Sequence, residues 1–268
     1  MVRSRMLVLP FPNFDPVLVQ MGPLKIHWYG LAYAAGIVLG WKYALYLAKR
    51  YVPTILPQYL DGFVTWIVVG IVVGGRFGHI LFYDLSHYIS HPVEILMTWK
   101  GGMSFHGGLA GAVIAAFIYC RRLRIPLFVF GDILTSACTI GLGLGRITNF
   151  INAELYGITT DLPWGVVFPN AGAMPRHPSQ LYEAFGEGAL LWIVLHQAWK
   201  IPGLRSQPGR ITGLFFMGYG IVRFLVEYVR EPEIIYAVAG CAITQGQVLS
   251  LPLIALGAWW LRRQAKKN

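Results

Sequence analysis

The sequence predicts an all-α integral membrane protein with seven transmembrane helices, from its composition, its long apolar runs and the placement of its basic residues. Of the 268 residues, 56% are hydrophobic and 13% are charged, and the mean hydropathy is +0.54. A soluble domain is usually about 45–50% apolar and about 25% charged. The composition therefore favours a polytopic membrane protein over a large soluble core.

The net charge and the cysteines exclude other classes of protein. A formal net charge of +10 is also typical of nucleic-acid-binding proteins, but here the basic residues form short clusters between apolar runs, which is the pattern of membrane topology. Cys120, Cys138 and Cys241 lie far apart without metal-ligand spacing. We expect no nucleic-acid partner, no disulfide framework, and no metal or organic cofactor. We also expect no cleaved signal peptide, because the first residues lack a long apolar core.

Seven apolar runs are long enough to be considered as spans, since a membrane helix needs roughly 20 mostly apolar residues. They cover residues 27–48, 60–83, 105–120, 128–149, 181–199, 211–229 and 244–261. The third run is short, and a re-entrant segment could begin it. We expect one polytopic domain over residues 1–268.

The basic residues predict the orientation of these spans. Twelve of the 22 lysines and arginines follow the first, third, fifth and seventh runs. They are Lys49, Arg50, Arg121, Arg122, Arg124, Lys200, Arg205, Arg210, Arg262, Arg263, Lys266 and Lys267. The positive-inside bias therefore predicts a cytoplasmic C-terminus and an outside N-terminus, although the basic N-terminal tail with Arg3, Arg5 and Lys25 argues against it. The polar connection at about 150–180 then lies outside, as a small periplasmic cap with too few apolar residues for a core of its own.

Three arginines, Arg76, Arg146 and Arg223, lie toward the outer ends of predicted helices. A charge at the centre of an inserted helix costs about 2.5–3.5 kcal/mol, and less near the interface. One interpretation is pairing with acids inside the bundle, since Glu227 shares a helix face with Arg223. The other is an anionic ligand, because few acids were found near the outer ends and a guanidinium fork matches phosphate. We favour the ligand.

Two further polar segments accompany these arginines. Residues 99–111 surround His106 with glycines, which let another backbone or a substrate approach closely, although a lone histidine beside a membrane helix is more often a satisfied polar residue than a catalyst. Residues 175–184 carry His177 and Gln180 at the start of the fifth run. This segment is either a proline-led helix start capped by Ser179 or a polar wall of the same pocket, and the residues leave both open.

Six segments in a fixed order carry a resemblance to a known family. They are HWYGLAY (27–33), GGRFGHILFYD (74–84), WKGGMSFHGG (99–108), GLGRITNFINAELYG (143–157), RHPSQLYEA (176–184) and RFLVEYVREP (223–232). Along essentially its whole length the chain resembles the bacterial phosphatidylglycerol–prolipoprotein diacylglyceryl transferase family. It departs from that family at Thr148, where an arginine-x-glycine-asparagine run has glycine, and at Ile158, where arginine is common.

The resemblance implies an activity, partners and a location. The expected reaction transfers the diacylglyceryl group of phosphatidylglycerol to the lipobox cysteine of a prolipoprotein, which forms a thioether and releases glycerol phosphate. The expected partners are phosphatidylglycerol, the prolipoprotein signal peptide with its lipobox, and the lipid bilayer. The expected location is the bacterial cytoplasmic (inner) membrane, with the active site toward the periplasm.

With this reaction in view, we assign Arg146 and Arg223 to the phosphate as catalytic residues. His106 is the candidate general base, because histidine titrates near neutral pH. The other residues expected to bind substrate are Tyr29, Arg76, Asn149, Asn152, Glu154, Gly157, His177, Gln180 and Glu227. We expect Glu227 to hold Arg223 in place rather than to act as an acid.

A membrane transporter or lipid permease with an anion-binding outer cavity is the alternative, since intramembrane arginines also occur in carriers. Such a protein would be expected to show repeat symmetry, and we find no internal repeat. A third class, a structural subunit that uses the arginines for assembly, predicts that their replacement harms expression rather than activity. Both alternatives rank below the enzyme.

Overall fold

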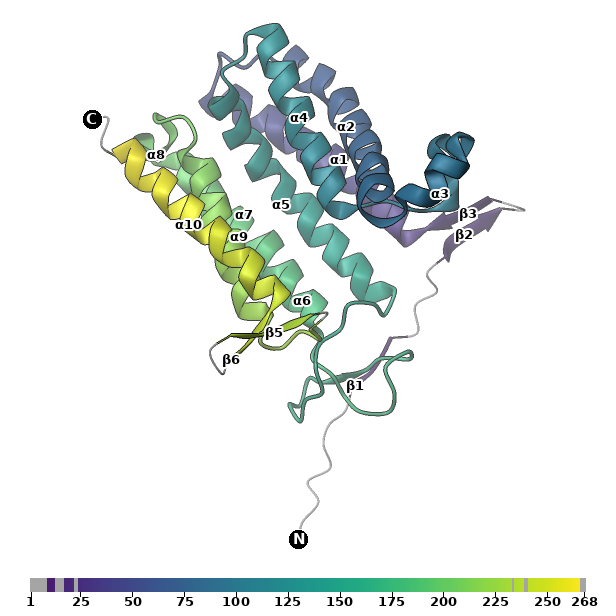
Figure 1. Cartoon of the computed structure of the whole chain (residues 1–268). Coiled ribbons are helices and arrows are strands. Elements are labelled where there is room, and N and C mark those ends of the chain that lie inside the picture. The colour runs from purple at the N-terminus through teal and green to yellow at the C-terminus, as the bar shows by residue number, and fades with distance from the viewer. Residues whose placement is uncertain (1–8, 13–16, 22–23, 233, 239–240, 266–268) are drawn as a thin grey trace. The chain divides into compact units, whose positions relative to one another are not determined.

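A computed structural model provides the structure of the chain (Figure 1). The described residues are 9–12, 17–21, 24–232, 234–238 and 241–265. Four of the basic residues used above for orientation therefore lie outside the described residues, namely Arg3, Arg5, Lys266 and Lys267. The chain divides into two compact units: the first takes in Met1–Tyr43 and Asp132–Asn268, and the second is Ala44–Gly131.

Each of the seven ranges expected to span the membrane is helical. The long helices are α1 (Trp28–Tyr51), α2 (Pro57–Tyr83), α4 (Phe105–Leu123), α5 (Leu127–Ile151), α9 (Arg210–Val226) and α10 (Gln245–Ala265). The fifth range combines α6 (Ser179–Glu183), the π-helix η3 (Ala184–Leu190) and α7 (Leu191–Lys200), which α8 (Pro202–Arg205) follows. Among the described helices, α1, α2 and α5 are long and apolar enough to cross a membrane by length and composition.

In the second unit, α2 and α4 pack through glycines. A Cβ atom added to Gly74 would lie 2.4 Å from the carbonyl oxygen of Gly107, and one added to Gly111 would lie 2.0 Å from that of Gly70. No side chain fits at such distances, so the two backbones touch, as small residues allow between membrane helices. The glycines beside His106 therefore admit the backbone of α2.

The connection between α2 and α4, which we call the arm (residues 84–102), consists of short helices. They are α3 (Leu85–Ser90), η1 (Pro92–Leu96) and η2 (Thr98–Lys100). Glu94 accepts a hydrogen bond of 2.7 Å from the Lys100 ammonium, and its other oxygen lies 3.1 Å from Nε2 of His87. Large apolar side chains such as Leu96 and Trp99 remain exposed on the arm.

In the first unit, α5 holds the start of α9 with a buried carboxylate. Asp132 accepts hydrogen bonds from the backbone N–H groups of Gly209 (2.8 Å) and Thr212 (2.7 Å), and from the Thr212 hydroxyl (2.7 Å). A negative charge at a helix N-terminus is favourable. Farther along, α9 lies beside α10 (Figure 1), and a Cβ on Gly257 would stand 2.6 Å from the Gly213 carbonyl oxygen.

Three small two-stranded sheets accompany the helices, which the all-α prediction omitted. In the first, β1 (Leu9–Pro10) pairs in parallel with β4 (Val166–Val167). The antiparallel pairs are β2 (Val17–Met21) with β3 (Leu24–His27), and β5 (Ile235–Val238) with β6 (Cys241–Thr244).

The cap (residues 150–180) takes part in a small core to which a residue outside the cap contributes. Ala153, Val166 and Phe168 are buried together. Phe11, from the N-terminal segment, and Phe150, from the end of α5, pack against Phe168 with ring centroids 5.5 and 5.8 Å away. Phe11, from outside the cap, therefore supplies apolar area that the cap alone lacks.

Candidate functional site

Three arginines and three glutamates form one ion-pair cluster in the first unit. Its members are Arg146, Glu183, Glu187, Arg223, Glu227 and Arg230. They come from α5, from the α6–η3 junction, and from the end of α9 with the turn after it. The cluster thus joins segments that lie far apart in the sequence.

Glu183 is the centre of this cluster. The residue is fully buried, and its Oε1 accepts hydrogen bonds from Nη1 of Arg223 and from Nη1 of Arg230, the latter at 2.9 Å. Its Oε2 lies 3.3 Å from Nη1 of Arg146. One carboxylate therefore bridges three guanidinium groups and fixes the distance between the two arginines assigned to phosphate.

The other two glutamates complete the pairing. Nε of Arg146 donates to Oε2 of Glu187 at 3.2 Å, and Nη2 of Arg223 lies 3.0 Å from Oε2 of Glu227. With Glu183 and Arg230, the cluster holds three charges of each sign. The interpretation that few acids lie near these arginines was therefore wrong, because it left out Glu187.

Glu187 lies in the π-helix η3, and the sequence held a signal for it. Glu183 and Glu187 are four residues apart in the fifth apolar run, so they face the same way on a helix. The π-helix spans Ala184–Leu190, and such turns often occur at functional sites. A Cβ on Gly188 would lie 2.6 Å from Cα of Gly143, which explains how η3 comes close to α5.

Although they are paired, Arg146 and Arg223 keep donors for a ligand. Their side chains are 18% and 17% exposed. Within the described residues, Nη2 of Arg146 and Nε of Arg223 have no hydrogen-bond partner. Pairing with acids and binding of an anion are therefore compatible at these two side chains.

A second polar group centres on Glu154. Oε1 of Glu154 accepts hydrogen bonds from the amides of Asn149 (2.7 Å) and Asn152 (3.4 Å). The Gln180 amide donates to the backbone carbonyl of Glu154 at 2.6 Å. The structure thus brings together four of the residues expected to bind substrate.

The backbone around Glu154 is strained. Ala153 and Leu155, on either side of it, have φ angles of 54° and 58°, in the left-handed region that non-glycine residues seldom adopt. Such strain is typical of functional turns. The exposed Glu154 carboxylate is held in this turn by Asn149 and Asn152.

Tyr29, on α1, lies near both groups. Its hydroxyl is 3.1 Å from that of Tyr33, and it interacts electrostatically with the charges of Arg146 and Glu154. The aromatic ring remains exposed. Tyr29 is therefore placed where it can contact a ligand held by either residue.

Gly157 and Ser179 have backbone and packing roles. A Cβ on Gly157 would lie 2.2 Å from the carbonyl oxygen of Val229, so only glycine lets the cap approach this turn. The Gly157 N–H donates to the His177 carbonyl at 2.9 Å. The Ser179 hydroxyl donates to the Leu155 carbonyl and does not cap α6, so of the two interpretations left open, capping by Ser179 is wrong.

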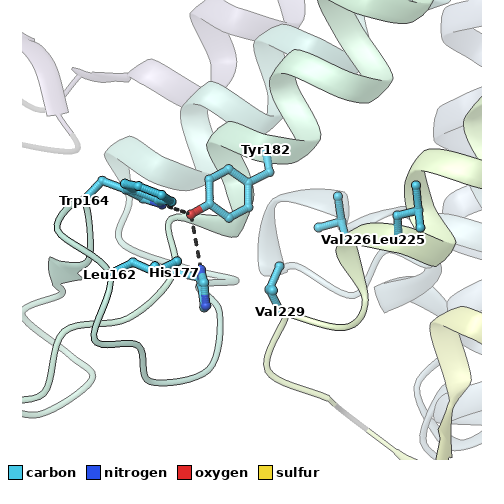
Figure 2. A pocket seen from close by; sticks show the side chains of 7 residues that line it. All are labelled: Leu162, Trp164, His177, Tyr182, Leu225, Val226 and Val229. Atoms are coloured by element: carbon cyan, nitrogen blue, oxygen red, sulfur yellow. Dashed lines mark hydrogen bonds between the residues drawn. The ribbon is translucent and has the colours of Figure 1, made fainter.

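His177 lies in the wall of a cavity of about 380 Å³ beside the cap (Figure 2). Its Nδ1 is 3.2 Å from the Tyr182 hydroxyl, which also accepts a hydrogen bond of 2.8 Å from Nε1 of Trp164. Burial lowers the pKa of His177 and favours its neutral form. The residues that line this cavity do not include Arg146 or Arg223, so the interpretation of this segment as a polar wall of the phosphate pocket stays a prediction.

The second unit contains the two remaining candidates, of which Arg76 is fully engaged. It is 3% exposed. Its guanidinium stands 4.9 Å from the centre of the Tyr88 ring. It donates to the backbone carbonyls of Glu94, Ile95, Met97, Gly101 and Gly102. Arg76 thus anchors the arm, a role that the sequence did not predict.

His106 is the second residue of α4 and is exposed. The Ser104 side chain caps this helix by accepting from the Gly107 N–H at 3.3 Å, and the Ser104 N–H donates to the Gly75 carbonyl at 2.9 Å. Within the described residues, the His106 ring has a contact with Phe105 and no hydrogen bond. Its ring nitrogens are therefore not engaged by another described residue.

Comparison with known proteins assigns the chain to a family. The model of the family described as prolipoprotein diacylglyceryl transferase matches residues 16–263. The chain belongs to the prolipoprotein diacylglyceryl transferase family. A relative from Azospirillum brasilense is 46% identical over 265 residues, 98% of each chain. One from Agrobacterium fabrum is 48% identical over 267 residues, 97% of this chain and 95% of the relative. Both are named phosphatidylglycerol–prolipoprotein diacylglyceryl transferase.

Within this diacylglyceryl transferase family, the chain accommodates its two departures from the pattern. Thr148 is buried, and its hydroxyl donates to the Leu144 carbonyl at 3.0 Å, so the added polar group is satisfied within α5. The N–H of Ile158 donates to the Val229 carbonyl at 3.0 Å, and any side chain permits that bond. Neither change disturbs the ion pairs of Arg146.

Proposed function

We propose that this chain is a phosphatidylglycerol–prolipoprotein diacylglyceryl transferase, which catalyses the first step of bacterial lipoprotein maturation. The observation that carries this proposal is 46–48% identity, over at least 97% of the chain, to relatives named for that reaction. The reaction moves the diacylglyceryl group from the lipid phosphate to the cysteine thiol of the prolipoprotein. The products are a thioether and glycerol phosphate.

The chemistry requires a thiolate and a stabilised leaving group. The cysteine sulfur attacks the glycerol carbon that carries the phosphate ester, and an S–C bond forms as the C–O bond breaks. The bonding electrons leave with the phosphate oxygen, so negative charge grows on glycerol phosphate. Preorganised donors at such a position are worth about 10²–10³ in rate each.

Arg146 and Arg223 are the donors proposed for this phosphate. Both are partly exposed and keep guanidinium nitrogens that no described residue binds, and arginine matches two phosphate oxygens at once. Because Glu183 already holds them near each other, little reorganisation is needed when the phosphate arrives. Glu227 and Glu187 offset the positive charge while the site is empty.

The remaining groups take the proton and orient the lipid. His106 accepts the thiol proton, a role supported by its exposed ring and its lack of a hydrogen bond among the described residues. Glu154, with Asn149, presents acceptors and donors for the two hydroxyl groups of the glycerol head. Tyr29 contacts the same head group from α1.

The membrane arrangement is part of this proposal. We infer one polytopic domain with seven transmembrane helices, the cap as a periplasmic insertion, and the active site toward the periplasmic side of the inner membrane. The clusters of basic residues after alternate apolar runs support this orientation. Labelling of single cysteines placed in the cap and at Arg122, with a membrane-impermeant thiol reagent on intact cells, tests it: the cap should react and position 122 should not.

An assay in detergent micelles tests the reaction. It combines phosphatidylglycerol with a lipobox peptide and follows the mass gain of the peptide and the release of glycerol phosphate. Stoichiometric products from wild type, lost in folded Arg146→Ala and Arg223→Ala but kept in the exposed control Arg122→Ala, are expected. No transfer by folded wild-type protein would contradict the proposal and favour the permease, for which lipid movement across vesicles is the next measurement.

A further inference from the structure

Two apolar cavities in the first unit share a pair of aromatic residues. One, of about 380 Å³, is lined by residues that include Leu162, Leu225 and Val229 (Figure 2). The other, of about 440 Å³, is lined by residues that include Leu9, Phe150 and Leu181. Trp164 and Tyr182 line both. Each volume falls in the range of ligand sites, about 300–1,000 Å³.

The shared aromatic pair forms a partition with a polar edge. Nε1 of Trp164 donates to the Tyr182 hydroxyl at 2.8 Å, and Nδ1 of His177 lies 3.2 Å from the same oxygen. Figure 2 shows the three side chains converging on that hydroxyl. Nε2 of His177 has no hydrogen-bond partner among the described residues. A ligand that enters both cavities therefore passes an available hydrogen-bonding group.

We propose that the two cavities hold two apolar side chains of the prolipoprotein segment beside the acceptor cysteine, and that Nε2 of His177 bonds the backbone of that segment. This inference rests on the proposed function. An extended peptide presents side chains at regular spacing and needs partners for its N–H and C=O groups. Two apolar cavities with one polar edge match that chemistry.

A peptide fits these cavities better than a lipid acyl chain does, for two reasons. An acyl chain already lies in hydrocarbon and gains no hydrophobic free energy from an apolar pocket, whereas an apolar side chain at the membrane surface does gain it by leaving water. An acyl chain also has no use for His177. Moreover, Leu162 and Trp164, which wall the first cavity, come from the loop of the cap and not from a long apolar helix.

The cavities also lie next to the ion-pair cluster along the chain. Tyr182 precedes Glu183, which bridges the arginines, and Val229 precedes Arg230. A segment held by Tyr182 and Val229 is therefore within a few residues' length of the phosphate donors. That placement suits the residues that flank an acceptor cysteine.

A binding experiment tests the proposal without turnover. A labelled acceptor peptide with its cysteine replaced by serine is titrated, in micelles, against wild type and against Val229→Phe, which fills the first cavity. The matched control is Ile221→Phe, at an exposed position on α9 outside both cavities. We expect Val229→Phe to weaken binding about tenfold, the equivalent of about 1.4 kcal/mol, and Ile221→Phe to leave it unchanged.

A second peptide sharpens the result. With alanine in place of the apolar residues before the serine, binding to wild type should weaken about tenfold, but Val229→Phe should then add little, since both changes remove the same contact. Leu162→Phe, on the exposed loop of the cap, repeats the test if Val229→Phe does not fold. Equal binding by wild type and both cavity variants would overturn the proposal. The proposal would also be overturned if the cavity variants raised the KM for phosphatidylglycerol but left peptide binding unchanged, because the cavities would then hold a lipid acyl chain.

The same measurements separate this inference from the proposed function. If wild type and the variants bind the peptide as expected but wild type transfers no lipid, peptide binding in the cavities is confirmed and the proposed reaction is contradicted. If wild type transfers lipid normally and the variants with filled cavities bind the peptide as tightly as wild type does, the proposed reaction is confirmed and peptide binding in the cavities is contradicted.

Discussion

The arginines of the two units are satisfied in opposite ways. In the first unit, Arg146 and Arg223 face the side chains of glutamates and keep 18% and 17% of their own side chains exposed. In the second, Arg76 is 3% exposed and donates to five backbone carbonyls, and it has no carboxylate partner in the part of the chain that the structure describes. The glutamates leave Nη2 of Arg146 and Nε of Arg223 without a hydrogen-bond partner among the described residues, whereas the carbonyls of the arm occupy all three guanidinium nitrogens of Arg76. The same residue type is therefore proposed to bind a ligand in one unit and anchors the arm in the other.

The largest expected effect is the loss of catalysis when Arg146 or Arg223 of the first unit is replaced. Arg146→Lys and Arg223→Lys keep the charge but lose the fork that spans two phosphate oxygens. We expect kcat to fall about 10²–10³-fold, the loss typical of one preorganised donor, while the melting temperature changes little. Steady-state kinetics with phosphatidylglycerol and a lipobox peptide measure it. A near-normal kcat in both variants would show that these arginines do not bind the phosphate in the transition state.

Glu183→Gln breaks the bridge that holds those arginines. The amide has the same shape but no charge, so Arg146, Arg223 and Arg230 lose their shared partner. A displacement of about 1 Å at a reacting centre can cost about 10²-fold, and we expect a loss of that order in kcat with a smaller change in KM. The control is Glu231→Gln, an exposed partner of Arg176. Unchanged kcat in a folded Glu183→Gln protein would show that the bridge is dispensable.

Glu227→Gln should be milder than Arg146→Ala. Arg223 keeps Glu183 when Glu227 is neutralised, so the arginine stays near its place, and a loss of about tenfold or less in kcat follows if Glu227 contributes one ordinary charged hydrogen bond. Kinetics and melting curves of the two variants, compared side by side, measure the difference. Complete loss with normal folding would make Glu227 a direct participant.

Arg76→Lys is expected to affect stability more than catalysis, the opposite of Arg146→Lys. A lysine has three donors on a single nitrogen and cannot serve all five carbonyls that Arg76 binds, and each carbonyl left buried without a donor costs about 1–3 kcal/mol. We expect the melting temperature to fall and the arm to become sensitive to protease, with a smaller loss in kcat per folded molecule than Arg146→Lys shows. A large drop in kcat at unchanged stability would instead place Arg76 on the substrate.

The helices could be predicted because length and hydropathy are local properties of the chain. All seven apolar runs are helical, and their ends differ from the structure by a few residues. The group formed by Asn149, Asn152 and Glu154 could also be predicted, since these residues are close in sequence and end one helix. A short sequence separation fixes most of their geometry.

Other features depend on distant segments and could not be predicted in the same way. The carbonyl cage of Arg76 requires the path of the arm, which no side-chain pattern encodes. The core of the cap depends on Phe11, from a remote part of the chain. The left-handed φ angles of Ala153 and Leu155 contradict local preference. Glu187, by contrast, could have been predicted. It lies four residues after Glu183 in the same apolar run, and including it predicts a cluster in which acids balance the charges of the arginines.

The smallest expected effect concerns the exposed ion pairs that Glu94 forms on the arm with Lys100 and His87. Lys100 and then His87 lower the pKa of Glu94 to about 2. Since this pKa lies below the ordinary value of 4.5, the pairing stabilises the arm fully above about pH 4.5 and is lost as the pH falls toward 2. Exposed pairs contribute little, so the effect stays local to the arm.

Hydrogen exchange measures this local effect. Amide exchange in residues 91–102, corrected for the intrinsic pH dependence, is compared between wild type and Glu94→Gln. Wild type should be better protected above pH 4.5, and the difference should shrink steadily as the pH falls toward 2. Equal protection of wild type and Glu94→Gln at every pH would mean that the Glu94 backbone carbonyl, which Arg76 binds and which both proteins retain, orders the arm and the carboxylate does not. In that case the anchor in the second unit would act without any ionised partner on the arm.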